Sequence, residues 1–111
     1  MNTTAMKLAP KKLTEMDVLR ALRDVEDPEL GLSIVDLGLI YSIQLDEEKC
    51  RVEMTLTSQG CPIGPALMSD VQERAKEATG LDDVEVRLVW DPPWDPAIMA
   101  TDDAKFILGI F

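Results

Sequence analysis

Two stretches in which apolar and polar residues alternate constrain the fold of this chain most strongly. The first covers residues 35–46, and its apolar members are Val35, Leu37, Leu39, Tyr41, Ile43 and Leu45. The second covers residues 50–57 and places on one side Cys50, Val52, Met54 and Leu56. Successive side chains of a strand point to opposite faces, so the pattern predicts two strands with one buried face. The polar residues 46–49 between them predict a hairpin turn.

Helical patterns flank this hairpin. Residues 14–25 repeat apolar residues every three or four positions after an N-cap at Thr14, and we expect this helix to end before Pro28. Residues 65–79 form a second helical pattern, which starts at a proline and stops at Gly80. Residues 83–90 alternate again and predict a third strand, with Trp90 at the end of its core face.

The remaining C-terminal residues complete the predicted architecture. Residues 91–100 hold three prolines and predict no regular structure, whereas residues 101–109 predict a short helix capped by Thr101. We therefore expect an α/β (α+β) fold of the order α-β-β-α-β-α, a two-layer sandwich with helices on one face of a small three-stranded mixed sheet. The second and third strands should be parallel, since a helix connects them. Residues 14–111 are expected to form one domain, preceded by a flexible tail at residues 1–13.

Charge and composition exclude several classes of function. The formal net charge is −10, which disfavours binding to nucleic acid. No apolar run approaches the length of about 18 residues that a membrane span needs, and the N-terminus lacks the apolar core of a secretion signal. A cytoplasmic location follows as the expectation. The chain has no histidine, so a thiol-dependent hydrolase with a histidine base is disfavoured.

The two cysteines have different expected roles. Cys50 should point into the core, where a thiol behaves as a small hydrophobe. Cys61 follows the end of a strand and precedes a helix, in a loop rich in glycine and proline, where helix N–H groups favour a thiolate. Thr57 and Ser58 lie near it in sequence and could donate hydrogen bonds. The alternative is that Cys61 is only a small residue in a tight turn.

Other polar and aromatic residues are weaker candidates. Asp36 interrupts the apolar run of the first strand and could orient or deprotonate Cys61 from the polar face of the sheet. The acidic loop that includes Asp27 and Glu29 is either solvated surface or a contact for a partner. Trp94 lies in a proline-rich loop and is either part of the core or an exposed contact for a partner.

Three stretches carry a resemblance to a known family: "DPELGLSIVDLGLIY", "VEMTLTSQGCPIG" and "VWDPPWDPAIMATDDAKFILG". From about residue 14 onward, the chain resembles the SufT/PaaD-like family of metal–sulfur cluster biosynthesis proteins. The resemblance implies the fold of the small iron–sulfur cluster assembly domain, with Cys61 as the reactive centre. The characteristic positions of the family fall on Asp27, Pro28, Glu29, Asp36, Thr57, Ser58, Gly60, Cys61, Pro62 and residues 90–94. One departure is Gln59, where many members have proline.

The resemblance implies an accessory factor in iron–sulfur cluster assembly or transfer, rather than a turnover enzyme. Iron or a transient iron–sulfur cluster would contact Cys61, with Thr57 and Ser58 beside it. Because one cysteine cannot complete a four-thiolate site, a homodimer, a partner or an external thiol would supply the other ligands. Expected partners are assembly proteins and client apoproteins. The alternatives are an adaptor that recruits clients through its acidic surface and Trp94, or a PaaD-like component of phenylacetate ring-oxygenase maturation. The extra C-terminal cysteines expected of the PaaD branch are missing here, which favours the SufT-like branch.

Overall fold

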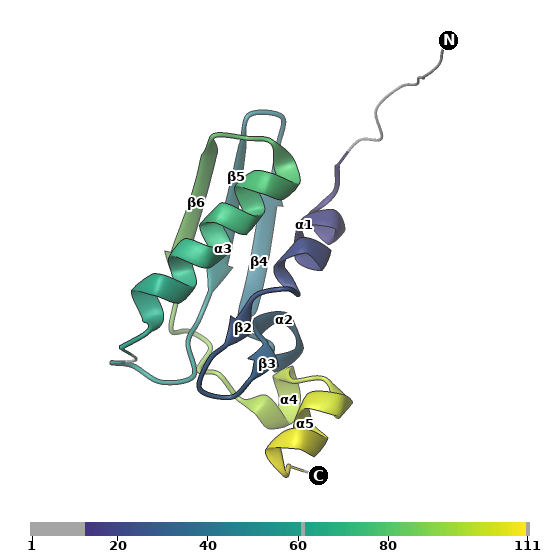
Figure 1. Cartoon of the computed structure of the whole chain (residues 1–111), viewed down its shortest axis with the longest axis vertical. Helices are drawn as coiled ribbons and strands as arrows, with labels where there is room; N and C mark the ends of the chain where they lie inside the picture. The colour runs from purple at the N-terminus through teal and green to yellow at the C-terminus, as the bar shows by residue number, and fades with distance from the viewer. Residues whose placement is uncertain (1–12, 61, 111) are drawn as a thin grey trace.

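A computed structural model describes residues 13–60 and 62–110 of the chain. The predicted flexible tail falls almost wholly on residues 1–12, which lie outside the described residues and leave that prediction untested. The elements in chain order are α1 (Glu15–Leu22), β2 (Glu26–Asp27), β3 (Leu32–Ser33), α2 (Ile34–Leu37), β4 (Ile40–Leu45), β5 (Lys49–Met54), α3 (Gly64–Thr79), β6 (Asp83–Leu88), α4 (Pro96–Met99) and α5 (Asp102–Leu108) (Figure 1).

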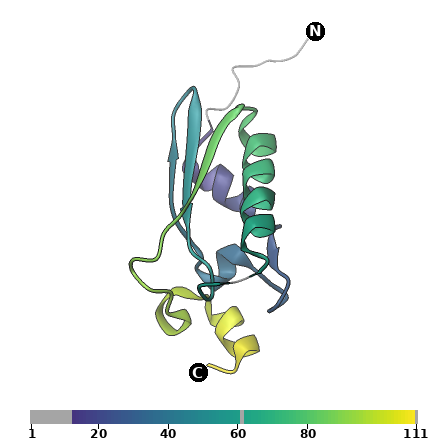
Figure 2. The ribbon, with the colours of Figure 1, turned by 90° about the vertical axis from the view of Figure 1, so that its left-hand side faces the viewer.

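The main sheet has the strand order β4-β5-β6, with β4 antiparallel and β6 parallel to β5. Helices α1 and α3 contact each other and cover one face of this sheet, while no helix of the described residues runs along the other face (Figures 1 and 2). The predicted two-layer arrangement, the hairpin and the parallel pairing of the last two strands are therefore confirmed. A separate two-stranded ribbon, β2-β3, lies at the end of α1 and was not predicted.

The core lies between the two helices and the covered face of the sheet. Its fully buried side chains include Val18, Leu22, Ile34, Leu37, Leu39, Cys50, Val52, Met54 and Val71. Burying one such aliphatic side chain contributes about 1.5–3 kcal/mol relative to leaving it in water. This packing, rather than any single polar contact, holds the two layers together.

The ends of the long helices follow their sequence signals. The Thr14 hydroxyl accepts a hydrogen bond from the Asp17 backbone N–H, and the Asp17 carboxylate accepts one from the Thr14 N–H at 2.9 Å. This reciprocal pair is a capping box and fixes where α1 begins. Helix α3 has Pro65 in its first turn and ends at Gly80, whose φ of +72° is the left-handed conformation that glycine favours.

The strand predicted to begin at residue 35 is wrong in its first part. Residues 34–37 form the short helix α2, in which the Ser33 hydroxyl accepts a hydrogen bond from the Val35 N–H at 3.2 Å. Gly38, with φ +83°, ends the helix. Ile34 and Leu37 are both fully buried and lie three positions apart, which is the spacing of one face of a helix. The same residues therefore fit a helical pattern as well as the alternation of a strand. The local cap and stop signals determined the structure here.

A bulge in β4 changes which residues face the core. Ile40 pairs with Met54, but Ser42 pairs with Glu53, so Tyr41 is an additional residue on the β4 side. Ile40 consequently lies on the same face as Met54 and packs against the core. The alternation in residues 35–46 would place Ile40 among the polar residues of the opposite face, and the bulge shows that this expectation is wrong.

Two expectations for the C-terminal part are also wrong. Residues 96–99 form the helix α4 despite the prolines, because Pro96 occupies its first turn and the Asp95 carboxylate accepts the Ala97 N–H at 3.1 Å. Trp90 is 37% exposed, since β6 ends at Leu88 and the chain has left the sheet by residue 90. The predicted helix capped by Thr101 is confirmed as α5.

Two hydrogen bonds join the segment that follows β6 to α2 and β4, near the lower end of the sheet in Figure 1. The indole N–H of Trp94 donates to the carbonyl of Leu37 at 2.7 Å, and the Tyr41 hydroxyl donates to the carbonyl of Pro92 at 2.8 Å. Burial raises the pKa of Tyr41 above its ordinary value, so the hydroxyl remains a donor at neutral pH. Trp94 is half-buried and packs against the core.

Gly38 allows the closest backbone approach in this region. A Cβ atom added at Gly38 would lie 2.4 Å from the carbonyl oxygen of Met99. A side chain at this position would therefore collide with the backbone of α4, besides occupying a left-handed conformation. The contact between α2 and α4 depends on glycine.

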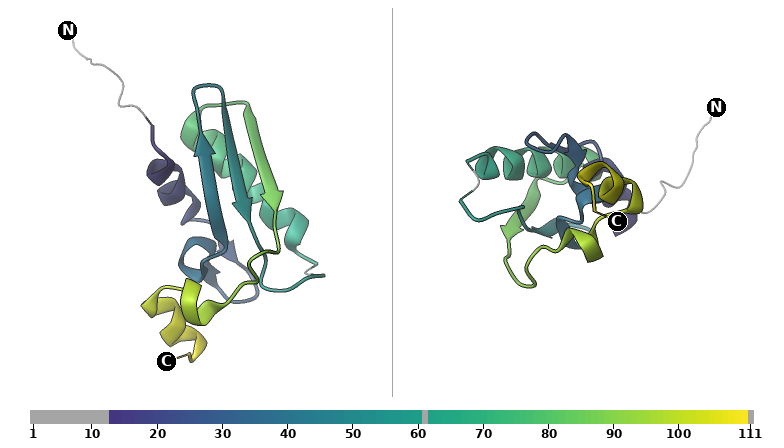
Figure 3. Two further views of the ribbon diagram at one scale, coloured as in Figure 1. Left: turned by 180° about the vertical axis from the view of Figure 1, so that it is seen from behind. Right: turned by 90° about the horizontal axis from the view of Figure 1, so that it is seen from below.

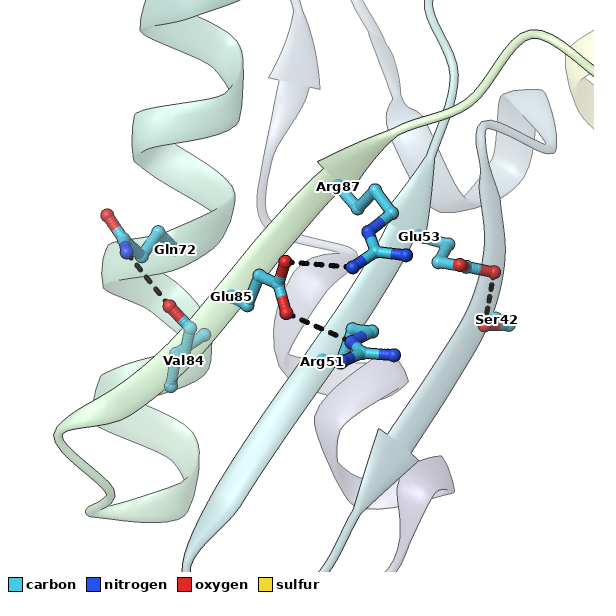
Figure 4. Close-up of polar contacts among 7 residues, drawn as sticks. All are labelled: Ser42, Arg51, Glu53, Gln72, Val84, Glu85 and Arg87. Atoms are coloured by element: carbon cyan, nitrogen blue, oxygen red, sulfur yellow. Dashed lines mark hydrogen bonds and ion pairs between the residues drawn. The ribbon is translucent and has the colours of Figure 1, made fainter.

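The uncovered face of the sheet, seen in Figure 3 (left), carries a cross-strand ion pair between Arg51 and Glu85 (Figure 4). Opposite charges face one another in the register of β5 and β6 at Lys49 and Asp83, at Arg51 and Glu85, and at Glu53 and Arg87. Glu85 lies 3.0 Å from Arg51 Nε and 3.2 Å from Arg87 Nη2. Hydrogen bonds from Arg87 and from Arg51 hold the pKa of Glu85 below its ordinary value.

Replacing Gly38 by alanine should destabilise the protein more than the same change at Gly80. Both glycines have a positive φ, but a Cβ at Gly80 meets no atom within 4 Å. We expect Gly80→Ala to lose about 1 kcal/mol from the left-handed conformation alone. Gly38→Ala should lose about 1–3 kcal/mol more through the collision with Met99. Urea unfolding measures both, and equal losses would contradict the close approach.

Replacing Glu85 by glutamine should lower stability at pH 7 and have less effect in acid. The folded-state pKa of Glu85 is lowered, so its contribution is present above the unfolded pKa of about 4.3 and is lost as the pH falls through the folded value. The melting temperatures of wild type and Glu85→Gln should therefore converge below about pH 4. Glu47→Gln, in the exposed hairpin turn, is the matched control. A difference that persists unchanged at low pH would contradict the role of these ion pairs.

Candidate functional site

The loop from residue 55 to residue 63 connects the end of β5 to the start of α3. Thr55 is fully buried, Thr57 is half-buried, and Ser58, Gln59 and Gly60 are exposed. The alternation in residues 50–57 would place Thr55 on the face away from the core, and its burial shows that this expectation is wrong. Gly60 has a φ of +77°, a conformation that other residues rarely adopt. The loop thus turns sharply directly before residue 61.

Cys61, the main candidate, lies outside the described residues, as do its contacts. The start of α3 after it is described: Ile63 occupies the N-cap position, and no side chain caps the helix there. The first N–H groups of a helix have no partner within the helix, and the helix dipole places partial positive charge there. The end of α3 nearest the cysteine is therefore electropositive at the backbone level.

Asp36 lies on α2 rather than on a strand, so its predicted place on the polar face of the sheet is wrong. Its carboxylate is 3.2 Å from Nη2 of Arg23. Its backbone carbonyl accepts a hydrogen bond from the Thr101 N–H at 2.8 Å, at the start of α5. The side chain of Asp36 therefore joins α2 to Arg23, and its backbone joins α2 to the start of α5. The distance between Asp36 and Cys61 is not defined, because Cys61 lies outside the described residues.

Asp27 is buried, in contrast to the expectation of a solvated acidic loop. Only 1% of its surface is exposed, and its Oδ1 atom accepts hydrogen bonds from the N–H groups of Glu29 and Leu30 at 2.8 and 3.3 Å. Its backbone carbonyl also accepts the Gly31 N–H at 2.7 Å. The Asp27 carboxylate therefore shapes the turn between β2 and β3. Glu29 lies on the exposed surface of this turn.

The β2-β3 turn, α2, the loop after β5 and helices α4 and α5 all lie at one end of the molecule (Figures 1 and 2). The family positions on Asp27, Glu29, Asp36, Thr57, Ser58 and Trp94 are thus gathered at one end, although they come from four separate segments. Trp94 is tied to Leu37 by its indole N–H and packs against the core, so its ring is a structural contact here. The sequence alone could not predict that these positions lie together at one end of the molecule.

Cys50 is confirmed as a core residue. It is 1% exposed on β5, and burial raises the pKa of its thiol, with a smaller contribution from the negative charge of Glu15. A thiol in this state is protonated at neutral pH and is a weak nucleophile.

Sequence reasoning missed the structural roles of Arg23 and Asp27. The turn of Asp27 had a signal, because aspartate followed by proline, with glycine four positions later, is typical of a tight turn. The pairing of Arg23 with Asp36 had no signal in the sequence, since the two residues belong to different parts of the fold. Within residues 13–60 and 62–110, no group of three or more metal-ligating side chains is placed to hold a metal ion. In the same described part, no helix has both the length and the apolar character needed to cross a bilayer.

Comparisons with known proteins agree with this fold. A model of the family described as iron–sulfur cluster assembly protein matches residues 15–88. The Fe-S protein maturation auxiliary factor SufT of Staphylococcus aureus is 47% identical over 87 residues, which are 78% of this chain and 98% of that protein. The auxiliary factor YitW of Bacillus subtilis is 42% identical over 95 residues, 85% of this chain and 92% of that protein.

A solved structure from Bacillus anthracis, described as a domain of unknown function, is also similar. It is 37% identical, has a TM-score of 0.80, and the match covers 87% of this chain and 92% of that one. The family match, the relatives and the solved structure agree with one another. The chain therefore belongs to the iron–sulfur cluster assembly protein family.

Proposed function

We propose that this protein is an accessory factor in the maturation of iron–sulfur proteins, in which Cys61 contacts iron, a cluster or a client cysteine during transfer. The observation that carries the proposal is membership of the assembly family, together with relatives named as maturation auxiliary factors. Iron or the cluster is cargo in this proposal, received and passed on. The protein performs no turnover reaction of its own.

The surroundings of residue 61 support a reactive thiol at that position. Gly60 turns the chain immediately before it, and α3 begins three residues after it without a side-chain cap. Unpaired N–H groups at a helix start stabilise a nearby anion, and a thiolate is both the nucleophile and the metal ligand among the forms of cysteine. Thr57 and Ser58 provide hydroxyl groups on the strand side of the same loop. We assign them the positioning of the bound group.

Asp36 is less suited to remove the thiol proton than its sequence position suggested. Its carboxylate pairs with Arg23, and a base in this position would first have to leave that pair. The electropositive start of α3 lowers the need for a base, because it favours the thiolate directly.

The ligand count places the remaining cluster ligands outside one chain. An iron–sulfur cluster is usually held by four thiolates, and Cys50 cannot contribute because it is buried on the core face of β5. We infer that a second copy, a partner or a small thiol supplies the other ligands. Such shared ligation fits transfer better than storage.

Replacing Cys61 by serine should abolish function in cells. In cells that lack the wild-type protein, the activity of an iron–sulfur enzyme should be restored by wild type and by Cys50→Ala, but not by Cys61→Ser. Cys50→Ala is the matched control, because it removes the other thiol of the chain. Full rescue by Cys61→Ser would overturn the cysteine-centred mechanism.

Pull-down with the same variants separates this mechanism from a pure adaptor. A transfer factor should keep its protein partners in the Cys61→Ser variant while maturation fails. Unchanged partners together with unchanged maturation would instead assign Cys61 an architectural role and favour the adaptor.

Alkylation of the native protein should modify Cys61 and spare Cys50. At about pH 7, iodoacetamide reacts with the thiolate, which the start of α3 favours at residue 61 and burial disfavours at Cys50. Mass spectrometry of digested protein measures both sites, and labelling in urea is the control in which both react. Equal labelling rates in the native protein would contradict the different states of the two thiols.

A further inference from the structure

The outer edge of β4 is open. β4 is the first strand of the order β4-β5-β6, and within residues 13–60 and 62–110 no strand pairs with its other side (Figure 3). Asp46 bonds toward β5, because its N–H donates to the carbonyl of Lys49 at 3.0 Å. Bonded and outward positions alternate along an antiparallel ladder, so the N–H and C=O groups of Ile43 and Leu45 point away from β5.

Two apolar hollows lie along this edge. The first, of about 220 Å³, is lined by Met16 and Leu19 of α1 and by residues 40–43 of β4. The second, of about 370 Å³, is lined by Gly38, Ile40, Tyr41, Pro92 and Met99. Both hollows are lined by Ile40 and Tyr41, and we call the two together the β4 groove.

The two edges of the sheet differ in how they are protected. β6 carries Asp83, Glu85 and Arg87, and the Gln72 amide donates to the carbonyl of Val84 at 2.9 Å (Figure 4). β4 reads Ile-Tyr-Ser-Ile-Gln-Leu and has neither a charged residue nor a proline. Exposed edges usually carry such protection against pairing with other chains. The bulge at Tyr41 interrupts the ladder near the start of β4, but it leaves Ile43 and Leu45 in regular register.

We propose that the β4 groove binds an extended segment of a partner protein by strand addition, with alternate apolar side chains in the groove and a basic side chain facing Glu15. Backbone bonds to Ile43 and Leu45 would supply affinity, and the apolar hollows would select side chains. Among the described residues that line the groove, Glu15 is the one that carries a charge. The net charge of −10 favours a basic segment and disfavours a second copy of this chain.

This proposal goes beyond the proposed function, because it requires neither iron nor Cys61. Its test therefore succeeds or fails independently of cluster maturation. Backbone pairing with Ile43 and Leu45 uses the half of β4 next to the β4-β5 hairpin, at the other end of the sheet from the loop at residues 55–63 (Figure 1).

The test uses the full chain and a blocked octapeptide, Ser-Val-Thr-Lys-Ser-Val-Thr-Ile, whose lysine lies on the same face as the apolar side chains that enter the groove. Its binding is followed by calorimetry and by amide hydrogen exchange. At saturation we expect exchange at the Ile43 and Leu45 amides to slow by at least about tenfold, because these N–H groups become hydrogen-bonded. A peptide with glutamate in place of lysine should bind at least about tenfold more weakly, and one with proline in place of both threonines should bind more weakly still.

Two variants locate the binding in the groove. Met16 is 53% exposed, so Met16→Lys should fold normally and abolish binding of the lysine peptide, whereas Ile107→Lys on α5 should leave it unchanged. Glu15→Lys should reverse the preference between the lysine and glutamate peptides, and Glu47→Lys in the hairpin turn should not. Binding that survives Met16→Lys, or a preference that Glu15→Lys leaves intact, would overturn the proposal.

Three other results would also overturn it. One is the absence of peptide binding at about 1 mM, the weak limit of specific recognition. Another is protection of Ile43 and Leu45 in the peptide-free protein at every protein concentration, which would assign the groove to a segment of the same chain. The last is protection that rises with protein concentration together with a dimer in ultracentrifugation, which would assign it to a second copy.

Discussion

The burial of a single face of the three-stranded sheet is the interaction on which the rest of the structure depends. Cys50, Val52 and Met54 of β5 are fully buried beneath α1 and α3, and removing apolar surface from water is the dominant favourable contribution to folding. One-sided burial fixes β5 in the centre of the sheet, and the end of β5 fixes the start of the cysteine loop. It also fixes the direction of α3, whose first turn closes that loop. The candidate site is thus a consequence of how the core is packed.

The C-terminal segment completes the end of the molecule at which the site lies. Gly38 allows the backbone of α4 to approach α2, Trp94 binds the carbonyl of Leu37, and the Thr101 N–H binds the carbonyl of Asp36. These contacts explain why residues from four segments meet at one end, and they give Asp36 and Trp94 structural roles.

Much of the fold could be predicted from the sequence because its signals were local. The capping box at Thr14 and Asp17, the glycine after α3 and the alternation in β5 each specify their element without distant contacts. The errors arose where two patterns overlapped or tertiary contacts decided. Residues 34–37 fit a strand by alternation and a helix by their Ser33 cap, and Trp90 left the core because the sheet ended before it. The burial of Asp27 and the Arg23–Asp36 pair depend on packing between elements, which no local pattern reports.

The central claim is that the thiol of Cys61 takes iron or a cluster as cargo, although a single chain cannot complete the ligand set. The most direct measurement is the iron and acid-labile sulfide content of protein purified without oxygen and reconstituted with a small thiol present. Wild type and Cys50→Ala should bind iron, and Cys61→Ser should bind much less. A colourless wild-type protein that takes up no iron, or equal iron in the Cys61→Ser variant, would contradict this account.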